Sequence, residues 1–155
     1  MRMKALSPEV LYDSLTVALN GNAAPPVVVK NPKGLKIAQP TPYAIGPRDE
    51  FLNFFAGPAV ETAAEEYSHG IPQVLRLMNA APFNARSPLA ESLASVSETT
   101  PEKIDTLCLA VLSRRPTADE RQTLAEYVEQ EGANARAFSG AIWVLLNTSE
   151  FLVNR

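Results

Sequence analysis

The chain has 155 residues, of which 46% are hydrophobic, and its formal net charge is −3. This composition is typical of one globular domain and excludes a disordered chain. Because the overall charge is slightly negative and no apolar run approaches ~20 residues, we expect no nucleic-acid partner and no membrane span. The N-terminus also lacks the apolar stretch of a signal peptide.

The first predicted element is a helix within residues 1–20. Ser7 is a suitable N-cap, Pro8 suits the first helical position, and Asn20-Gly21 is a termination signal, so the helix is expected over Pro8–Leu19. The apolar spacing predicts one buried face, made up of Val10, Leu11, Leu15, Ala18 and Leu19.

Residues 21–47 are predicted to form a long Pro-rich loop, since six of the chain's 13 prolines lie there. Val27–Val29 and Leu35–Ile37 flank a turn-forming segment, so one short β-hairpin is predicted near residues 27–37. A loop of this length inside a compact domain is either functional or loosely ordered. The sequence leaves both interpretations open.

Short helices are predicted over residues 48–99. The first spans Arg48–Ala56 and carries three phenylalanines, interpreted as a core anchor rather than a partner surface because aromatic side chains are usually buried. A partial helix over Thr62–Tyr67 and a helix over residues 71–79 follow. Ser87-Pro88 repeats the cap-plus-proline signature and opens one more short helix.

A three-helix unit is predicted over residues 100–155. Thr100-Pro101 opens its first helix, which is expected over Pro101–Arg114, and Thr117 with Glu120 forms a capping box for the second. The third, from about Ala135 to Asn147, is apolar on most sides and is expected at the centre of the bundle. These elements together predict an all-α fold, an irregular helical bundle forming a single domain over residues 1–155.

The end of the first helix in this unit carries two cations. Arg114 and Arg115 follow the apolar pattern and are expected at the negative end of the helix, and Pro116 prevents the helix from continuing. Cys108 lies on the apolar face of the same helix. It is the only cysteine of the chain, so it cannot form an internal disulfide and is predicted to be a buried, inert thiol.

No catalytic residue is assigned. His69 is the only histidine and no G-x-S-x-G turn accompanies it, so a structural or hydrogen-bonding role is preferred to catalysis. One histidine and one cysteine fall short of the ligands that zinc needs, and Glu61, Glu65 and Glu66 lack the spacing of a calcium loop. No Gly-rich phosphate loop is present. We therefore expect no metal site and no cofactor in this chain.

The segment around His69 is the best candidate for a binding site. His69, Gln73 and Asn79 place polar groups beside an apolar helix, and Arg76 lies between them. At ~3.6 residues per turn, Gln73 and Arg76 share one face while Val74, Leu75 and Met78 occupy another. Two interpretations remain open: the amides satisfy backbone groups at helix ends, or they contact a ligand.

Four segments match a known family in order and spacing. They are residues 6–15, residues 69–79 (HGIPQVLRLMN), residues 112–120, which begin LSRRPT, and residues 145–152 (LLNTSEFL). Together they resemble the C-terminal domain of large planctomycete-type secreted proteins of unknown function, which often also carry a c-type-cytochrome-like module. The resemblance implies that the chain is a fragment of a longer, extracytoplasmic protein. It implies no established reaction, and the chain has no haem-attachment motif that would bring electron transfer to its own residues.

Two hypotheses follow for the function. The first is a non-catalytic helical module that packs against other domains of a larger secreted protein, or binds a protein partner or a glycan. The second is the C-terminal part of an enzyme, which contributes His69, Gln73 or Asn79 to a site that a missing domain completes.

Overall fold

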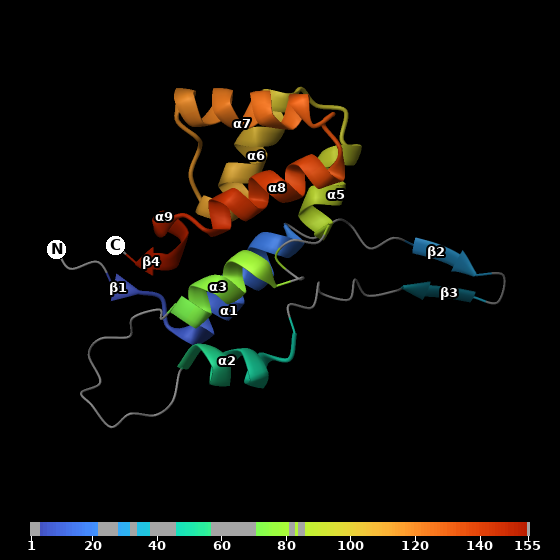
Figure 1. The fold of residues 1–155 in the computed structure, drawn as a ribbon. Helices are drawn as coiled ribbons and strands as arrows, with labels where there is room; N and C mark the ends of the chain where they lie inside the picture. The colour runs from blue at the N-terminus through green and yellow to red at the C-terminus, as the bar shows by residue number, and fades with distance from the viewer. Residues whose placement is uncertain are drawn as a thin grey trace.

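The computed structural model describes residues 4–21, 28–31, 34–37, 46–56, 71–80, 83 and 86–154. The protein is all-α: helices form its body, as predicted, and the strands of the described ranges are short (Figure 1). The helices are α1 (Pro8–Asn20), α2 (Arg48–Ala56), α3 (Ile71–Asn79), α5 (Pro88–Ser95), α6 (Thr100–Leu112), α7 (Ala118–Gln130), α8 (Ala135–Leu146) and α9 (Ser149–Leu152).

The short strands form two antiparallel pairs. β1 (Lys4–Ala5) pairs with β4 (Val153–Asn154), which brings the two ends of the described chain together (Figure 1). β2 (Val28–Asn31) pairs with β3 (Gly34–Ile37) and confirms the hairpin predicted near residues 27–37. The rest of the Pro-rich loop and the partial helix predicted over residues 62–67 lie outside the described residues.

Local capping sets most helix boundaries where the sequence predicts them. Ser7 accepts the N–H of Val10 at the start of α1 (3.5 Å), and Gly21 ends that helix with a φ of 65°, a conformation that favours glycine. Thr117 and Glu120 form the predicted reciprocal capping box of α7: the Thr117 N–H donates to Glu120 Oε2 (2.7 Å), and the Glu120 N–H donates to Thr117 Oγ1 (3.3 Å).

The prediction for α6 was wrong by one residue at its start and by two at its end. Its N-cap is Thr99 rather than Thr100, because the Glu102 carboxylate accepts both the N–H and the hydroxyl of Thr99 (2.9 and 2.7 Å). The helix ends at Leu112, since Ser113 takes the left-handed conformation with a φ of 57°.

The core surrounds α8, as its apolar composition predicts. In Figure 1 this helix crosses the molecule between α7 above and α1 with α3 below, and α5 and α6 pack against it. Its buried residues include Phe138, Ala141, Ile142, Leu145 and Leu146.

The lower half of the molecule in Figure 1 contains α1, α2 and α3. Leu11 and Leu15 of α1 are fully buried, whereas Val10 is 49% exposed, so the predicted buried face of α1 was wrong at this residue. In α2 the stacked rings of Phe51 and Phe55 (4.1 Å between centroids) are buried in the core, as predicted, but Phe54 lies at the surface.

Candidate functional site

Of the candidate residues of α3, Gln73 and Arg76 face α2 and Asn79 contacts its own helix. The Gln73 side-chain amide donates to the backbone oxygen of Phe54 (3.2 Å), near the end of α2, and the Asn79 amide donates to the backbone oxygen of Leu75 in its own helix (2.9 Å). Both amides thus contact the carbonyls of a helix end, which is the first of the two interpretations left open above. His69 lies outside the described residues.

Arg76 lies on the same face of α3 as Gln73. Its guanidinium stands 4.5 Å above the centre of the Phe54 ring, within the range of a cation–π contact. One of its nitrogens is 3.9 Å from the Glu50 carboxylate, which is at the limit of an ion pair. The structure therefore brings Gln73 and Arg76 together against α2, while Asn79 contacts only its own helix among the residues described.

One acceptor of this group is unsatisfied. Gln73 Oε1 is buried and has no hydrogen-bond partner among the described residues. The amide nitrogen donates to a carbonyl, which can only accept. Exchanging the amide oxygen and nitrogen would therefore place two acceptors, Gln73 Oε1 and the Phe54 carbonyl oxygen, against each other. A buried acceptor without a donor costs about 1–3 kcal/mol, so Gln73 Oε1 is a position where an additional donor would stabilise the protein.

The opposite face of α3 is apolar and exposed. It consists of Val74, Leu75 and Met78, of which Leu75 is 50% exposed. The indole N–H of Trp143 on α8 donates to the backbone oxygen of Met78 (2.9 Å) and so joins this face to the centre of the bundle.

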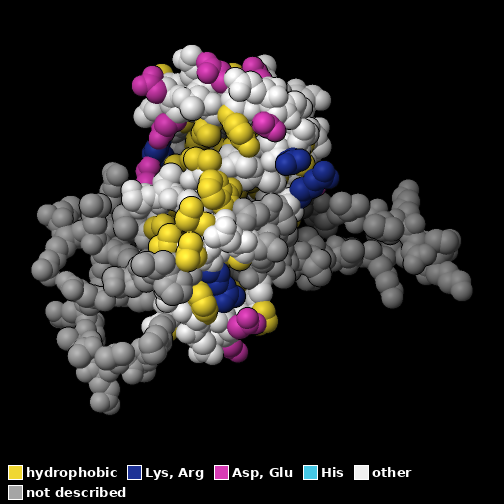
Figure 2. All heavy atoms as spheres, viewed as in Figure 1, with side chains coloured by type: hydrophobic (Ala, Val, Ile, Leu, Met, Phe, Trp, Pro, Cys, Tyr) yellow, Lys and Arg dark blue, Asp and Glu magenta, His cyan; other side chains and the backbone are white. Residues whose placement is uncertain are grey.

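The apolar surface continues from α3 across α8 to α7. In Figure 2, hydrophobic side chains form a band that starts over α7 and α8 in the upper part of the molecule and runs down to α3. Tyr127 of α7 is exposed and lines the same pocket as Trp143, and Val144, the residue after Trp143 on α8, is also exposed. We call this surface, made up of Val74, Leu75, Met78, Tyr127, Trp143 and Val144, the α3–α8 apolar face.

A shallow pocket of about 390 Å³ opens beside this face. Arg86 and Arg136 line it together with Glu131, Tyr127 and Trp143. Arg86 is 3.9 Å from the Glu91 carboxylate. The pocket combines two cations and one carboxylate with two aromatic rings, so its net positive charge favours an anionic group over a cation.

Tyr127 occupies the space beside Gly140, where a Cβ atom would overlap the phenol oxygen. Alanine is favoured over glycine in a helix by about 1 kcal/mol. We therefore expect Gly140→Ala to stabilise the protein by about 0.5–1 kcal/mol when Tyr127 is also replaced by alanine, and to lose that gain when Tyr127 is present. Urea denaturation of the four proteins of this cycle measures the difference. An equal gain in both backgrounds would show that the phenol does not fill this space.

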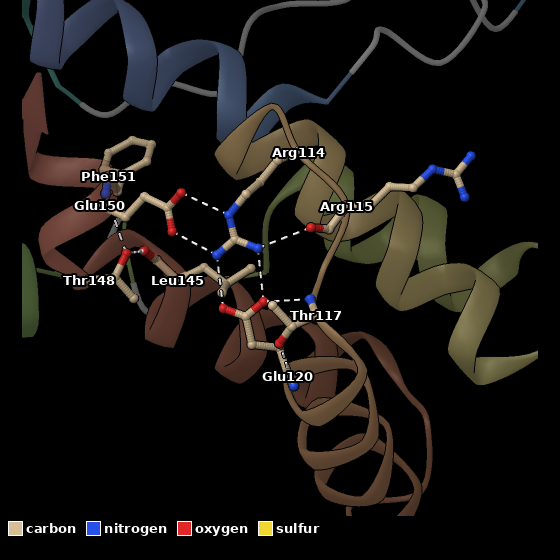
Figure 3. Close-up of polar contacts among 8 residues, drawn as sticks. All are labelled: Arg114, Arg115, Thr117, Glu120, Leu145, Thr148, Glu150 and Phe151. Carbon is tan, nitrogen blue, oxygen red and sulfur yellow. Dashed lines mark hydrogen bonds and ion pairs between the residues drawn. The ribbon is translucent and has the colours of Figure 1, made fainter. Parts of the chain in front are cut away.

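Arg114 forms the strongest polar network of the described residues, at the junction of α6, α7 and α9 (Figure 3). Its Nε–H and one terminal N–H donate to the two oxygens of Glu150 (2.8 and 2.7 Å). Its terminal nitrogens donate to the two oxygens of Glu120 (both 2.8 Å) and to the backbone oxygen of Arg115 (3.0 Å). All five N–H groups of the guanidinium are therefore used: four in two bidentate pairs with the carboxylates and the fifth on the Arg115 carbonyl.

The sequence reasoning missed this network. It placed Arg114 and Arg115 together at the end of a helix, but Figure 3 shows that the Arg115 side chain points away from the network. Arg115 instead lies 3.5 Å from Asp105, which also accepts from Arg121 (2.6 Å). The sequence did contain a signal for it: Glu120 and Glu150 lie in the segments 112–120 and 145–152, and both segments are among the four that carry the family resemblance.

Acid should weaken this junction. Hydrogen bonds from Arg114 and then from the Thr117 N–H lower the pKa of Glu120 from 4.5 to about 2. A carboxylate whose pKa is lowered by folding stabilises the protein fully above its unfolded pKa, and that contribution is lost as the pH falls from about 4.5 to about 2. Because the Glu120 side chain is 39% exposed, solvent screens it, and we expect a loss of about 1–2 kcal/mol.

The measurement is the urea midpoint between about pH 6 and pH 2. Glu120→Gln is the matched control, since it keeps the shape of the side chain but cannot titrate. The loss of stability on acidification should be smaller in this variant by about 1–2 kcal/mol. Parallel curves for the two proteins would contradict the assignment.

The described residues contain no cluster of three or more His, Cys, Asp or Glu side chains that could hold a metal ion. Cys108 is buried, as predicted, and burial raises the pKa of its thiol to about 11, so the thiolate is scarce at neutral pH. No helix in the described ranges is long and apolar enough to cross a membrane.

We compared the chain with family models, curated proteins and solved structures. No family model, no curated protein and no solved structure matches the chain.

Proposed function

We propose that the chain is a non-catalytic helical interaction module, and that it docks onto another domain of a larger extracytoplasmic protein through the α3–α8 apolar face. The observation that carries this proposal is the exposure of Val74, Leu75 and Met78 on one side of a helix whose other side packs against α2. Contiguous exposed apolar surface of this kind is typical of interaction sites. The resemblance of four segments to a domain of large planctomycete-type secreted proteins supports a domain of the same parent chain as the partner.

The aromatic residues of this face are suited to contact with a partner. Trp143 is already oriented by its hydrogen bond to Met78, so little side-chain entropy is lost when a partner covers it. Aromatic and methionine side chains are enriched in the buried centres of interfaces. The pocket of Arg86 and Arg136 beside the face adds a place for an acidic group, such as a carboxylate of the partner domain or of a glycan.

The test is hydrogen exchange of α3 in the longer parent protein, compared with this chain alone. We expect the amides of α3 to be more protected in the parent, and we expect Leu75→Asp to remove that extra protection, because an ionised carboxylate cannot be buried against an apolar partner. Val10→Asp is the matched control, since Val10 is as exposed as Leu75 but lies on α1. Equal protection of α3 in the two proteins would rule out this face as the docking site.

A second candidate function follows from the unsatisfied Gln73 Oε1. In that proposal the chain is the C-terminal part of an enzyme, and a missing domain or its substrate supplies the donor that Gln73 lacks. The site would then include His69, Gln73 and Asn79. Substitution of His69 or Gln73 by alanine in the parent protein separates the two proposals: an interaction module changes in stability or association with turnover unchanged, whereas an enzyme loses turnover while α3 stays protected.

A further inference from the structure

A groove runs between α1 and α6, separate from the α3–α8 apolar face. Two pockets of about 380 and 460 Å³ adjoin there, and both are lined by Val17, Ala110 and Ser113, so they form one continuous depression. Phe151 of α9 lines one end and Leu93 of α5 the other. We call this depression the α1–α6 groove.

Both long walls of the groove are regular helical stripes. Asp13 and Val17 of α1 and its C-cap Gly21 line it at steps of four residues, and Thr106 and Ala110 of α6 with its C-cap Ser113 line the other wall. At 1.5 Å per residue, the α1 stripe is about 12 Å long, or a little over two helical turns. A groove between two helices, of that length, fits one further short helix.

The groove exposes apolar side chains that the folded chain does not cover. Val17 is 64% exposed and Leu109 is 45% exposed, and Val96 at the α5 end is also exposed. Between them lie the small residues Ala110 and Ser113, which allow another backbone to come close. Apolar rims around a floor of small residues are suited to the apolar stripe of an amphipathic helix.

The charge of the groove is of one sign. Three carboxylates line it, from Asp13, Glu98 and Glu150, and no Lys or Arg of the described residues does so. Arg114 binds Glu150, and Arg48 forms a long ion pair with Asp13 (3.8 Å), so the carboxylate of the groove without a described ion pair is that of Glu98, at the α5 end. The pocket beside Trp143 has the opposite character, with two arginines.

We propose that the α1–α6 groove binds an amphipathic helix of a protein partner, with an apolar stripe of about two turns and with lysine or arginine at its flanks. The apolar stripe contacts Val17, Leu109 and Ala110, and a flanking cation lies near Glu98. Charge complementarity selects a basic partner over an acidic one. The proposal does not depend on the α3–α8 face, and the two can fail separately.

The experiment uses the full chain and a dye-labelled synthetic helix of roughly 15 residues, with leucines at helical spacing and lysines on both sides of the stripe. Fluorescence anisotropy should show saturable binding. The same peptide with glutamate in place of every lysine should bind at least about tenfold more weakly, and added salt should weaken only the lysine peptide.

Variants of the chain locate the site. Glu98→Lys should reduce binding of the lysine peptide about tenfold, and Ala110→Trp should reduce binding of both peptides by filling the groove. Glu98 is exposed, so its substitution leaves the fold intact, and circular dichroism checks this for both variants. Glu129→Lys on α7 is the charge-matched control, since Glu129 is exposed and lines neither surface, and it should leave binding unchanged.

Three results would overturn the proposal: equal binding of the two peptides, full binding by Glu98→Lys, or no binding of the lysine peptide up to its solubility limit. A concentration-dependent dimer of the chain that Ala110→Trp abolishes would also overturn it, because the groove would then hold a second copy rather than a basic helix.

Discussion

Replacing Phe138 by alanine is expected to lower the free energy of unfolding by about 4 kcal/mol. Phe138 is fully buried in α8, the helix around which the other helices pack, and the Lys103 ammonium lies 5.7 Å from its ring centre. The substitution removes a large apolar surface and leaves a cavity that the neighbouring helices cannot close. Urea denaturation followed by circular dichroism at 222 nm measures the change.

Val144→Ala is the matched control for Phe138→Ala. It lies on the same helix but is 46% exposed, and alanine is the better helix former. We expect a change of less than about 0.5 kcal/mol. If the two variants lose similar stability, α8 is not the centre of the fold.

Replacing Arg114 by alanine is expected to lower the free energy of unfolding by about 2 kcal/mol. Breaking an exposed ion pair costs little stability and breaking a buried one costs several kcal/mol. We expect an intermediate loss here, because the side chains of Arg114, Glu120 and Glu150 are each about one-third exposed (34, 39 and 31%). Without the guanidinium, two carboxylates remain close together with no shared cation. α9 should lose protection from hydrogen exchange first, since Glu150 is its link to Arg114.

Two further variants separate charge from geometry in this network. Arg114→Lys keeps the charge but cannot form two bidentate pairs, so it should recover less than about half of the loss. Arg115→Ala is the control: that side chain is 73% exposed and 3.5 Å from Asp105, and its removal should cost less than about 1 kcal/mol. Equal losses for the two arginines would mean that the bidentate network adds nothing to stability.

The two proposed interfaces lie on different surfaces and differ in charge. The α3–α8 apolar face borders a pocket with Arg86 and Arg136, whereas the α1–α6 groove is lined by Asp13, Glu98 and Glu150. A module with two such surfaces can contact two different segments at once.

Helix boundaries were the most predictable part of the fold, because a cap is decided within four or five residues. Ser7, Ser87 and Thr117 start helices where predicted, since each hydroxyl reaches an N–H only three residues further on. The apolar character of α8 likewise predicted its central place. The error of one residue at Thr99 arose because Thr99 and Thr100 are equivalent as caps until the position of Glu102 is considered.

The candidate site was less predictable. Helical spacing correctly separated Gln73 and Arg76 from Val74, Leu75 and Met78, but it could not indicate which face another helix would cover. Leu77 of α3 is buried, as its hydrophobicity predicts. The polar face of the helix, however, packs against Phe54 and Glu50 of α2. Val74, Leu75 and Met78 remain partly exposed (37, 50 and 38%). Val10 differs from its prediction for the same reason, since no helix of the described residues covers it.

The sequence by itself determined the all-α class, the order and most of the limits of the described helices, the hairpin near residues 27–37 and the burial of Cys108, because all of these depend on caps, turns and periodicity along a few neighbouring residues. Only the tertiary structure decided that Arg114 joins Glu120 to Glu150, 36 residues from Arg114 along the chain, and that Val74, Leu75 and Met78 of α3 stay partly exposed. Such contacts depend on which helices pack together. That is set by the summed burial of the whole core and cannot be read from any one segment.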